Sequence, residues 1–279
     1  MWVVQPFTSG AVIGEALSST SDPFRSVVSA AAWLLWLVIL LALALPQPIS
    51  LTVARVGAVG GVMATAWAAL EVPSSTSGGL IGIGVLAAAA AFATINMPGV
   101  GDRFVDGVSY GDEQRFLLRA PGPALFTLIG PAAVIVVLGA SVGPLLLADE
   151  QWIAGAIATV VGFAIAAVPL MALHRLTSRF LVFVPNGLVV HDRSQLREPV
   201  LFVTREIALG PAPADTTARD ITAGALGLAL ELRFSHMTEL PFVTGRTTTE
   251  TKAAKALLIS PTRTGAVLQT AVERKIAVN

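Results

Sequence analysis

VVSAAAWLLWLVILLALAL, residues 27–45, is the stretch that decides the architecture of this chain. A helix needs about 20 consecutive apolar residues to cross the core of a bilayer, and this stretch supplies them without one charged side chain. Comparable stretches follow it. The pattern predicts an all-α membrane bundle of five spans, at residues 27–45, 51–70, 79–97, 124–147 and 152–173.

Composition supports a membrane protein and excludes several function classes. Charged residues make up 13% of the chain, against about 25% in soluble domains. The net charge is zero, so we expect no nucleic-acid partner. The chain has no Cys, which excludes disulfides, thiolate metal sites and cysteine nucleophiles.

The distribution of basic residues predicts the orientation. Five spans place the two ends of the chain on opposite sides of the membrane. All Lys and Arg except Arg25 fall in segments on the C-terminal side. We expect a multi-pass protein of the cell (plasma) membrane. The positive-inside rule then places the N-terminus outside and the C-terminal segment in the cytoplasm. Residues 1–25 are then an extracytoplasmic tail, 26–174 the transmembrane domain, and 175–279 a cytoplasmic domain.

The segment 175–279 is predicted to form a β-rich α+β domain. Residues 180–184 and 188–190 flank Pro185-Asn186-Gly187, which predicts a hairpin whose Asn-Gly pair supplies positive φ. Leucines or Phe at every second position predict a strand over 226–234 with one buried face. After Pro261, residues 264–276 predict an amphipathic helix. Its apolar side is formed by Val267, Leu268, Val272 and Ile276, and the remaining expected strands are 201–203, 207–209, 240–243 and 256–260.

These features carry a resemblance to a known family. The 185–187 hairpin, the 226–234 strand and the Leu257–Pro261 lead into the final helix resemble the bacterial pleckstrin-homology-like (PH-like) domain. The whole chain is similar to uncharacterised multi-span membrane proteins of actinobacteria that carry such a domain. The resemblance implies a PH-like fold and a binding role beside the membrane. It implies no catalytic residue.

Four basic side chains are candidate contacts for anionic lipid head groups or a partner. Arg55 lies about four residues into the second span, from where its side chain can extend to the head groups. His174, Arg175 and Arg179 follow the fifth span directly, where basic residues meet anionic lipid. The alternatives are an interfacial anchor for Arg55 and plain topology determinants for the other three.

The loop 98–121 holds the densest acidic cluster, Asp102, Asp106, Asp112 and Glu113. Such carboxylates at a membrane surface can bind Mg²⁺ for head-group chemistry. The spacing does not by itself converge ligands, so we favour a solvated cytoplasmic loop or one docked on the C-terminal domain. Asp106-Gly107 resembles the start of the CDP-alcohol transferase motif, but the Ala-Arg and the later Asp pair of that motif are absent, so we reject the match.

Three glycine pairs spaced by four allow helices to approach closely. They are Gly57 with Gly61, Gly78 with Gly82, and Gly139 with Gly143. We interpret them as packing within the bundle, with an interface to another membrane protein as the alternative. Acidic or basic residues at the span centres, typical of ion-driven pumps, are lacking.

We therefore expect a non-enzymatic protein without catalytic residues, cofactor or metal. Five helices anchor a cytoplasmic domain that binds a partner or lipid, as an accessory or assembly subunit of a cell-envelope complex. The alternative is a small transporter or channel component with a regulatory domain. A lipid-modifying enzyme using residues 102–113 is the third hypothesis.

Overall fold

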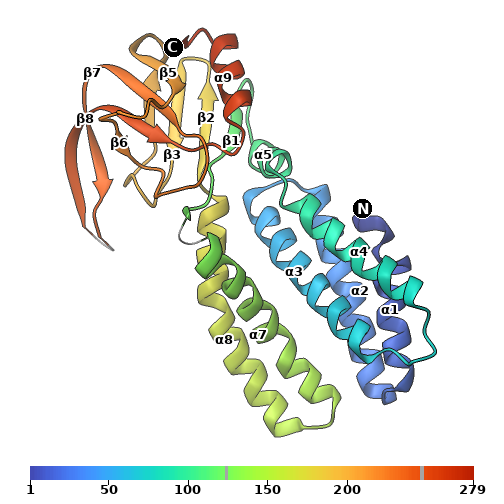
Figure 1. The fold of residues 1–279 in the computed structure, drawn as a ribbon. Helices are drawn as coiled ribbons and strands as arrows, with labels where there is room; N and C mark the ends of the chain where they lie inside the picture. Colours follow the sequence, from blue (N-terminus) through green and yellow to red (C-terminus); the bar gives the residue numbers. More distant parts are fainter. Residues whose placement is uncertain (123–124, 246–247) are drawn as a thin grey trace. The chain divides into compact units, whose positions relative to one another are not determined.

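A computed structural model describes residues 1–122, 125–245 and 248–279. The chain divides into two compact units (Figure 1). The helical unit comprises Met1–Val100 and Ile129–His174, and the sheet unit comprises Gly101–Leu128 and Arg175–Asn279. Both units are therefore built from two separate stretches of chain, which the expected boundary at residue 175 did not anticipate.

The described residues contain five helices long and apolar enough to cross a membrane, as the sequence predicts. The predicted start of the fourth span, Ala124, lies outside the described residues. Prolines begin three of these helices, where the missing N–H costs nothing. The helices are α2 (Asp22–Ala44), α3 (Pro48–Glu71), α4 (Gly78–Ile95), α7 (Gly130–Ala148, after the π-turn η3, Leu125–Ile129) and α8 (Trp152–Thr177).

The first 20 residues are folded rather than a tail. They form η1 (Trp2–Phe7), α1 (Ser9–Ala16) and η2 (Leu17–Ser19), and α1 packs against α3 and α4. Val12 and Leu17 are buried in this contact. Gly84 of α4 permits it, because a Cβ there would lie 2.5 Å from Val12 Cγ2. The apolar face of α1 explains why this segment joins the helices.

Glycine contacts also bring the long helices together. A Cβ on Gly139 of α7 would lie 2.5 Å from the carbonyl oxygen of Gly162 on α8. A Cβ on Gly57 of α3 would collide with Ile39 of α2. By contrast, Gly78 and Gly82 have no atom within 4 Å of the added Cβ. Two of the three glycine pairs therefore pack inside the helical unit, as we interpreted them.

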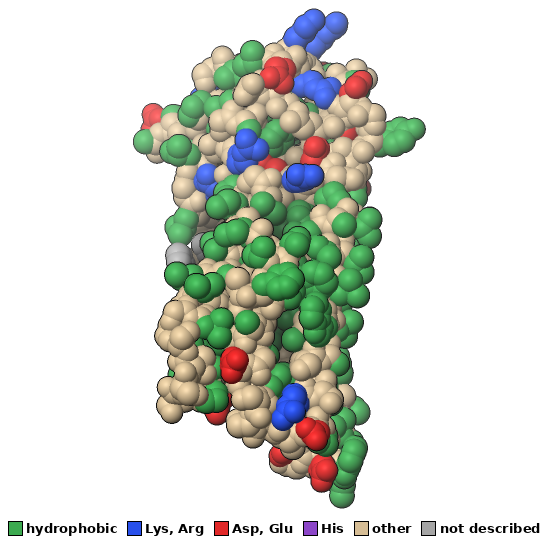
Figure 2. Space-filling model, turned by 90° about the vertical axis from the view of Figure 1, so that its right-hand side faces the viewer, with side chains coloured by type: hydrophobic (Ala, Val, Ile, Leu, Met, Phe, Trp, Pro, Cys, Tyr) green, Lys and Arg blue, Asp and Glu red, His purple; other side chains and the backbone are tan. Residues whose placement is uncertain are grey.

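The surface of the helical unit is divided along its length. Figure 2 shows a face with a broad band of hydrophobic side chains that carries no charged one, and with acidic groups and one basic group gathered toward one end. The helix ends and the turn at that end hold five acidic residues and Arg25. The acidic residues are Glu15, Asp22, Glu71, Asp149 and Glu150.

The first sheet of the sheet unit is a four-stranded antiparallel meander in the order β1-β2-β3-β4. Its first strand comes from the predicted loop 98–121, which instead forms α5 (Pro98–Asp106) and β1. The helices α7 and α8 are inserted between β1 and β2, which pair with each other. The strands are β1 (Gln114–Leu117), β2 (Phe180–Val184), β3 (Gly187–His191) and β4 (Val200–Val203).

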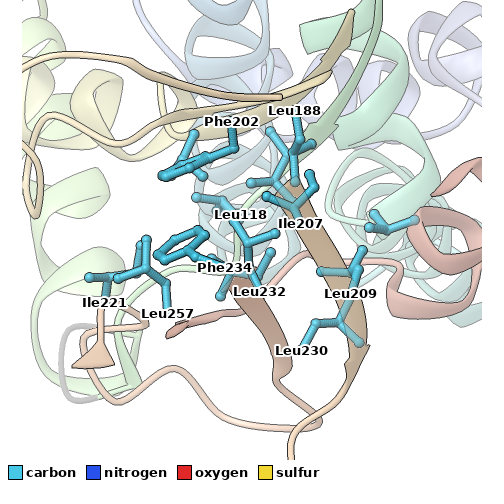
Figure 3. Close-up of a cluster of buried hydrophobic side chains, with 14 of the residues drawn as sticks. Leu118, Leu188, Phe202, Ile207, Leu209, Ile221, Leu230, Leu232, Phe234 and Leu257 are labelled. Atoms are coloured by element: carbon cyan, nitrogen blue, oxygen red, sulfur yellow. The ribbon is translucent and has the colours of Figure 1, made fainter. Parts of the chain in front are cut away.

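The second sheet has five strands in the order β6-β8-β7-β5-β9. Helix α9 (Thr264–Glu273) precedes the last strand. Figure 3 shows leucine and phenylalanine side chains of both sheets meeting in one core, where the rings of Phe202 and Phe234 stack 4.7 Å apart. The strands are β5 (Ile207–Pro211), β6 (Arg219–Asp220), β7 (Leu230–Val243), β8 (Thr249–Ile259) and β9 (Ala277–Val278), with η4 (Thr204–Glu206) before β5.

The predicted hairpin 180–190 is present, but its glycine has a different role. Neither Asn186 nor Gly187 is among the described residues with positive φ. A Cβ on Gly187 would lie 2.0 Å from the carbonyl oxygen of Phe202 in β4. The glycine is needed for the close approach of a neighbouring strand, so the prediction of a positive-φ turn was wrong.

The strand predicted over 226–234 begins later than predicted, at Leu230 of β7. Leu230, Leu232 and Phe234 are buried in β7 as expected, but Leu226 and Leu228 precede the strand and are exposed. Gly227 between them has a φ of +99°, which is incompatible with a regular strand. In the final helix Val272 is exposed rather than buried.

Candidate functional site

Two of the four predicted contact residues, His174 and Arg55, lie close to Thr52 in a polar cluster inside the helical unit. Thr52 Oγ1 of α3 lies 3.2 Å from His174 Nδ1 of α8. Arg55 follows Thr52 by almost one turn, and its Nε is buried without a hydrogen-bond partner among the described residues. A guanidinium at this place suits an anionic group, but the cluster by itself names no ligand.

The other two predicted contacts differ from each other. Arg175, near the end of α8, is exposed. Arg179 is buried, and its Nε and Nη2 donate to Asp192 Oδ2 at 2.9 and 2.7 Å. Its Nη1 donates to the carbonyl oxygen of Arg119 at 3.1 Å. Because these bonds use its guanidinium, we leave Arg179 out of the proposed lipid contacts.

Asp192 is a structural residue that sequence reasoning missed. It is 1% exposed and accepts four hydrogen bonds, two from Arg179 and two from the backbone N–H and hydroxyl of Ser194. Replacing either member of this pair leaves the other charge buried and unpaired. The pair therefore holds the start of β2 directly after α8 ends.

The acidic cluster at 102–113 holds the sheet unit together. Asp102 Oδ1 accepts from Leu117 N of β1 at 2.9 Å and from Thr262 Oγ1 at 3.0 Å. Burial raises the pKa of Asp102, while its two hydrogen bonds and Arg263 oppose this rise. Asp106 Oδ1 accepts from Arg115 N at 2.8 Å. The segment is thus docked on the C-terminal domain, the second of the two readings we favoured.

Within residues 1–122, 125–245 and 248–279, no three His, Cys, Asp or Glu side chains are grouped so that they could hold a metal ion. Asp112 and Glu113 have different bonding partners from Asp102. Glu113 pairs with Arg115 at 2.9 Å, which lowers the pKa of Glu113. The carboxylates of this segment are mostly engaged with their own neighbours.

A concave surface on the second sheet encloses a volume of about 730 Å³, and we call it the β8 surface. Charged side chains of both signs surround two large apolar ones, Phe234 and Met237. Glu231 pairs with Arg233 at 2.7 Å and accepts from Thr216 Oγ1 at 2.8 Å. Burial raises the pKa of Glu231, but these bonds outweigh it and lower the pKa. The surface is lined by residues 217–220 and 253–256 with Glu231, Arg233, Phe234 and Met237.

One side of this surface is an open strand edge. Among the described residues, β8 pairs with β6 only at Leu257 and Leu258, although β8 begins at Thr249. The remaining outer edge of β8 has no strand beside it in the described part of the sheet. The outer edge of β7 is covered differently, because Arg197 N donates to Pro241 O at 2.9 Å.

The hydrogen bond from Arg197 N to Pro241 O shows which main-chain groups of β8 face away from β7. Pro241 points its carbonyl away from β8, so its pairing with Thr251 is a non-hydrogen-bonded pair. The N–H and C=O of Thr251 therefore point to the open edge. By the alternation of the ladder the same holds for Ala253 and Thr249. An exposed row of such groups is a template for another extended chain.

A second, smaller pocket of about 230 Å³ lies in the helical unit, between η1, α1, α2 and α3. Several of its polar groups bond within the protein. Trp2 Nε1 donates to Trp36 O at 2.9 Å, and Trp36 Nε1 donates to Trp2 O at 3.2 Å. Gln5 Nε2 donates to Ala87 O at 2.9 Å. The pocket is mainly apolar and does not favour transport of a polar solute.

Comparison with known proteins found no matching family model, no matching curated protein and no matching solved structure. The structure itself defines a class: a protein with five helices long and apolar enough to cross a membrane, and a sheet-rich C-terminal region with one helix, α9, near its end.

Proposed function

We propose that this protein is a non-enzymatic membrane anchor whose water-facing sheet unit binds an extended segment of a partner protein at the β8 surface. By binding this partner, the chain acts as an accessory or assembly subunit of a cell-envelope complex. The observation that carries the proposal is the open edge of β8 beside a concave surface of about 730 Å³.

Connectivity supports the anchoring role. The sheet unit is joined to the apolar helices three times, through α5, η3 and α8. Only Ser178 and Arg179 separate α8 from β2. Because the three steps from Thr177 to Phe180 span at most about 11 Å, β2 begins within this distance of the end of α8. A domain tethered in this way presents its surface beside the membrane.

Strand pairing also constrains the topology. β1 and β2 lie in one sheet, so both strands are on one side of the membrane. The chain between them must then cross an even number of times, which α7 and α8 satisfy. The opposite end of the helical unit carries five acidic residues and Arg25, which under the positive-inside rule favours a cytoplasmic sheet unit.

The strand order supports the PH-like likeness. Four consecutive antiparallel strands form one sheet, a second sheet follows, and a helix comes near the end of the chain. In this protein the first strand is separated from the second by two apolar helices. The likeness favours a binding module over a catalytic domain.

The edge itself has the properties of a selective binding strand. Main-chain pairing supplies affinity when an extended peptide adds to a sheet, and adjacent side-chain pockets supply specificity. Glu250, Lys252 and Lys255 on β8 restrict indiscriminate pairing, as charges do on natural edge strands. A partner segment must match these charges and the Arg219 side of the concave surface.

The test replaces Thr251 in the full chain. Thr251→Pro removes an N–H that faces the open edge and leaves the hydrogen bonds to β7 intact, as proline is tolerated on edge strands. Thr251→Val is the matched control because it keeps the N–H. The three proteins are purified in mild detergent, and co-purifying proteins are quantified by mass spectrometry.

We expect one partner protein to co-purify in stoichiometric amount with the wild type and with Thr251→Val. We expect this partner to be lost with Thr251→Pro. Equal recovery with both variants contradicts binding at the edge. A monomer that co-purifies with nothing contradicts the assembly role. Near-ultraviolet circular dichroism confirms that all three proteins have the same sheet packing.

A further inference from the structure

Two leucines outside the buried core remain unexplained by partner binding at β8. Leu226 is 57% exposed and Leu228 is 76% exposed. They belong to the turn between β6 and β7, residues 222–229, which we call the leucine loop. Two large apolar side chains that point outward from one short loop indicate a surface that something apolar covers.

The leucine loop is held in place by the segment that follows β1. Arg119 Nη1 donates to the carbonyl oxygens of Leu226 and Leu228 at 3.2 and 2.9 Å. A Cβ on Gly122 would lie 2.2 Å from Gly224 O and 3.4 Å from Leu226 Cγ. The backbones of the two segments are therefore in direct contact.

The segment that holds the loop leads directly into a span. The apolar helix of the fourth span begins at Thr127, five residues after Gly122, and both residues belong to the sheet unit. Five residues reach at most about 18 Å even when fully extended. A loop that touches Gly122 therefore lies within this distance of the point where the chain enters the bilayer.

We propose that the leucine loop inserts Leu226 and Leu228 into the interfacial region of the bilayer that holds the protein's own helices. The partner is the lipid surface, because the loop contacts the segment that leads into the fourth span. Arg119 orients the loop by its two hydrogen bonds and places a cation near the head groups, where basic residues are favoured.

This inference rests on the membrane insertion in the proposed function, and not on peptide binding at β8. The test uses single cysteines, which the absence of native cysteine makes unambiguous. Leu228→Cys is the test site, and Val272→Cys on α9, 62% exposed, is the matched control. Val160→Cys on α8, 72% exposed, reports insertion of the spans.

Each variant carries an environment-sensitive fluorophore and is reconstituted into vesicles of phosphatidylcholine and phosphatidylglycerol. Nitroxide-labelled lipid and aqueous iodide serve as quenchers. We expect nitroxide lipid to quench the probes at residues 160 and 228 severalfold more than the probe at 272, and iodide to do the reverse.

Two failures are distinguishable. If the probe at 160 is quenched by lipid and the probe at 228 behaves like that at 272, the helices are inserted and the leucine loop does not touch lipid. If the probe at 160 is itself quenched only by iodide, membrane insertion fails and both proposals fall.

Discussion

The helical unit and the sheet unit hold their parts together by different means. In the helical unit, Gly139 and Gly162 bring the backbones of α7 and α8 into contact, and Gly84 does the same for α4 and α1. In the sheet unit, buried carboxylates join separate segments. Asp192 binds Arg179, and Asp102 joins α5 to β1 and Thr262.

This difference follows from the solvent proposed for each unit. Lipid tails are as apolar as leucine, so helices in a bilayer associate by close packing of small residues. A water-facing unit can expel apolar surface into a core, and buried charges then specify how segments join it. The comparison predicts that polar substitutions are costly in the sheet unit and steric substitutions in the helical unit.

The largest effect is expected for Asp192→Ala. It leaves the Arg179 guanidinium buried and unpaired, and breaking such a pair costs about 3–5 kcal/mol. Thermal unfolding in detergent, followed by the loss of β-sheet circular dichroism, measures the change. A loss below 1 kcal/mol, on the order of an exposed pair, contradicts the role assigned to Asp192.

Asp22→Ala is the matched control for this prediction. Asp22 also pairs with an arginine, Arg25 at 3.3 Å, but its side chain is 90% exposed. Exposed pairs contribute about 0–1 kcal/mol. The contrast between the two aspartates measures how much burial adds to one ion pair.

The second prediction concerns packing in the helical unit. Gly139→Val places a side chain where Gly162 O lies 2.5 Å from the new Cβ, and overpacking of this kind costs about 1–3 kcal/mol. Unfolding in mixed micelles with increasing dodecyl sulfate measures the loss. Gly82→Val, with no atom within 4 Å of the Cβ, is expected to change nothing. Equal behaviour of the two variants contradicts the glycine contact between α7 and α8.

The third prediction uses the pH dependence of Asp102. Its pKa is raised mainly by burial, so the folded protein holds this proton more tightly than the unfolded chain does. Stability of the sheet unit therefore falls as pH rises from the unfolded pKa through the raised folded one. Asp102→Asn keeps an oxygen acceptor for Leu117 N and Thr262 and has no such penalty.

We expect Asp102→Asn to match the wild type at about pH 4 and to be more stable at neutral pH, where the wild-type carboxylate is charged. Melting temperatures across this range check the sign. Asp102→Ala, which removes the acceptor, is expected to be less stable at every pH because Leu117 N is left unpaired. Parallel curves for the wild type and Asp102→Asn contradict the raised pKa.

Hydrophobic patterning predicted the five helices because a charge-free window of 20 residues has few alternatives. It also predicted the hairpin over 180–190, and this hairpin contained more information than we used. Extending its register, Phe180 opposite His191, places Arg179 opposite Asp192. Opposite charges facing each other across strands favour pairing. The buried ion pair could therefore have been predicted from the sequence.

Other features depend on contacts that local patterns do not encode. The alternation of leucines continues through Leu226 and Leu228, and nothing in the pattern marks where the strand begins. Arg119, more than 100 residues earlier, holds that segment as a loop. Likewise β1 lies in an apparent loop, because its partner β2 follows two intervening helices. The β8 surface combines strands far apart in sequence and was not predicted.

The smallest effect is expected for Gln5→Leu, a polar substitution in the helical unit. Gln5 donates to Ala87 O at 2.9 Å and accepts from Ser9 Oγ at 2.6 Å. Ser9 also has Gly84 O within 2.9 Å, so its hydroxyl keeps an acceptor when Gln5 is lost. Hydrogen bonds between membrane helices contribute about 0.6 kcal/mol on average. We expect a loss of this size in the dodecyl sulfate titration, with exposed Gln151→Leu as the unchanged control. A loss comparable to that of Asp192→Ala would mean that buried polar bonds stabilise both units alike, and the contrast between them would then not follow from their solvents.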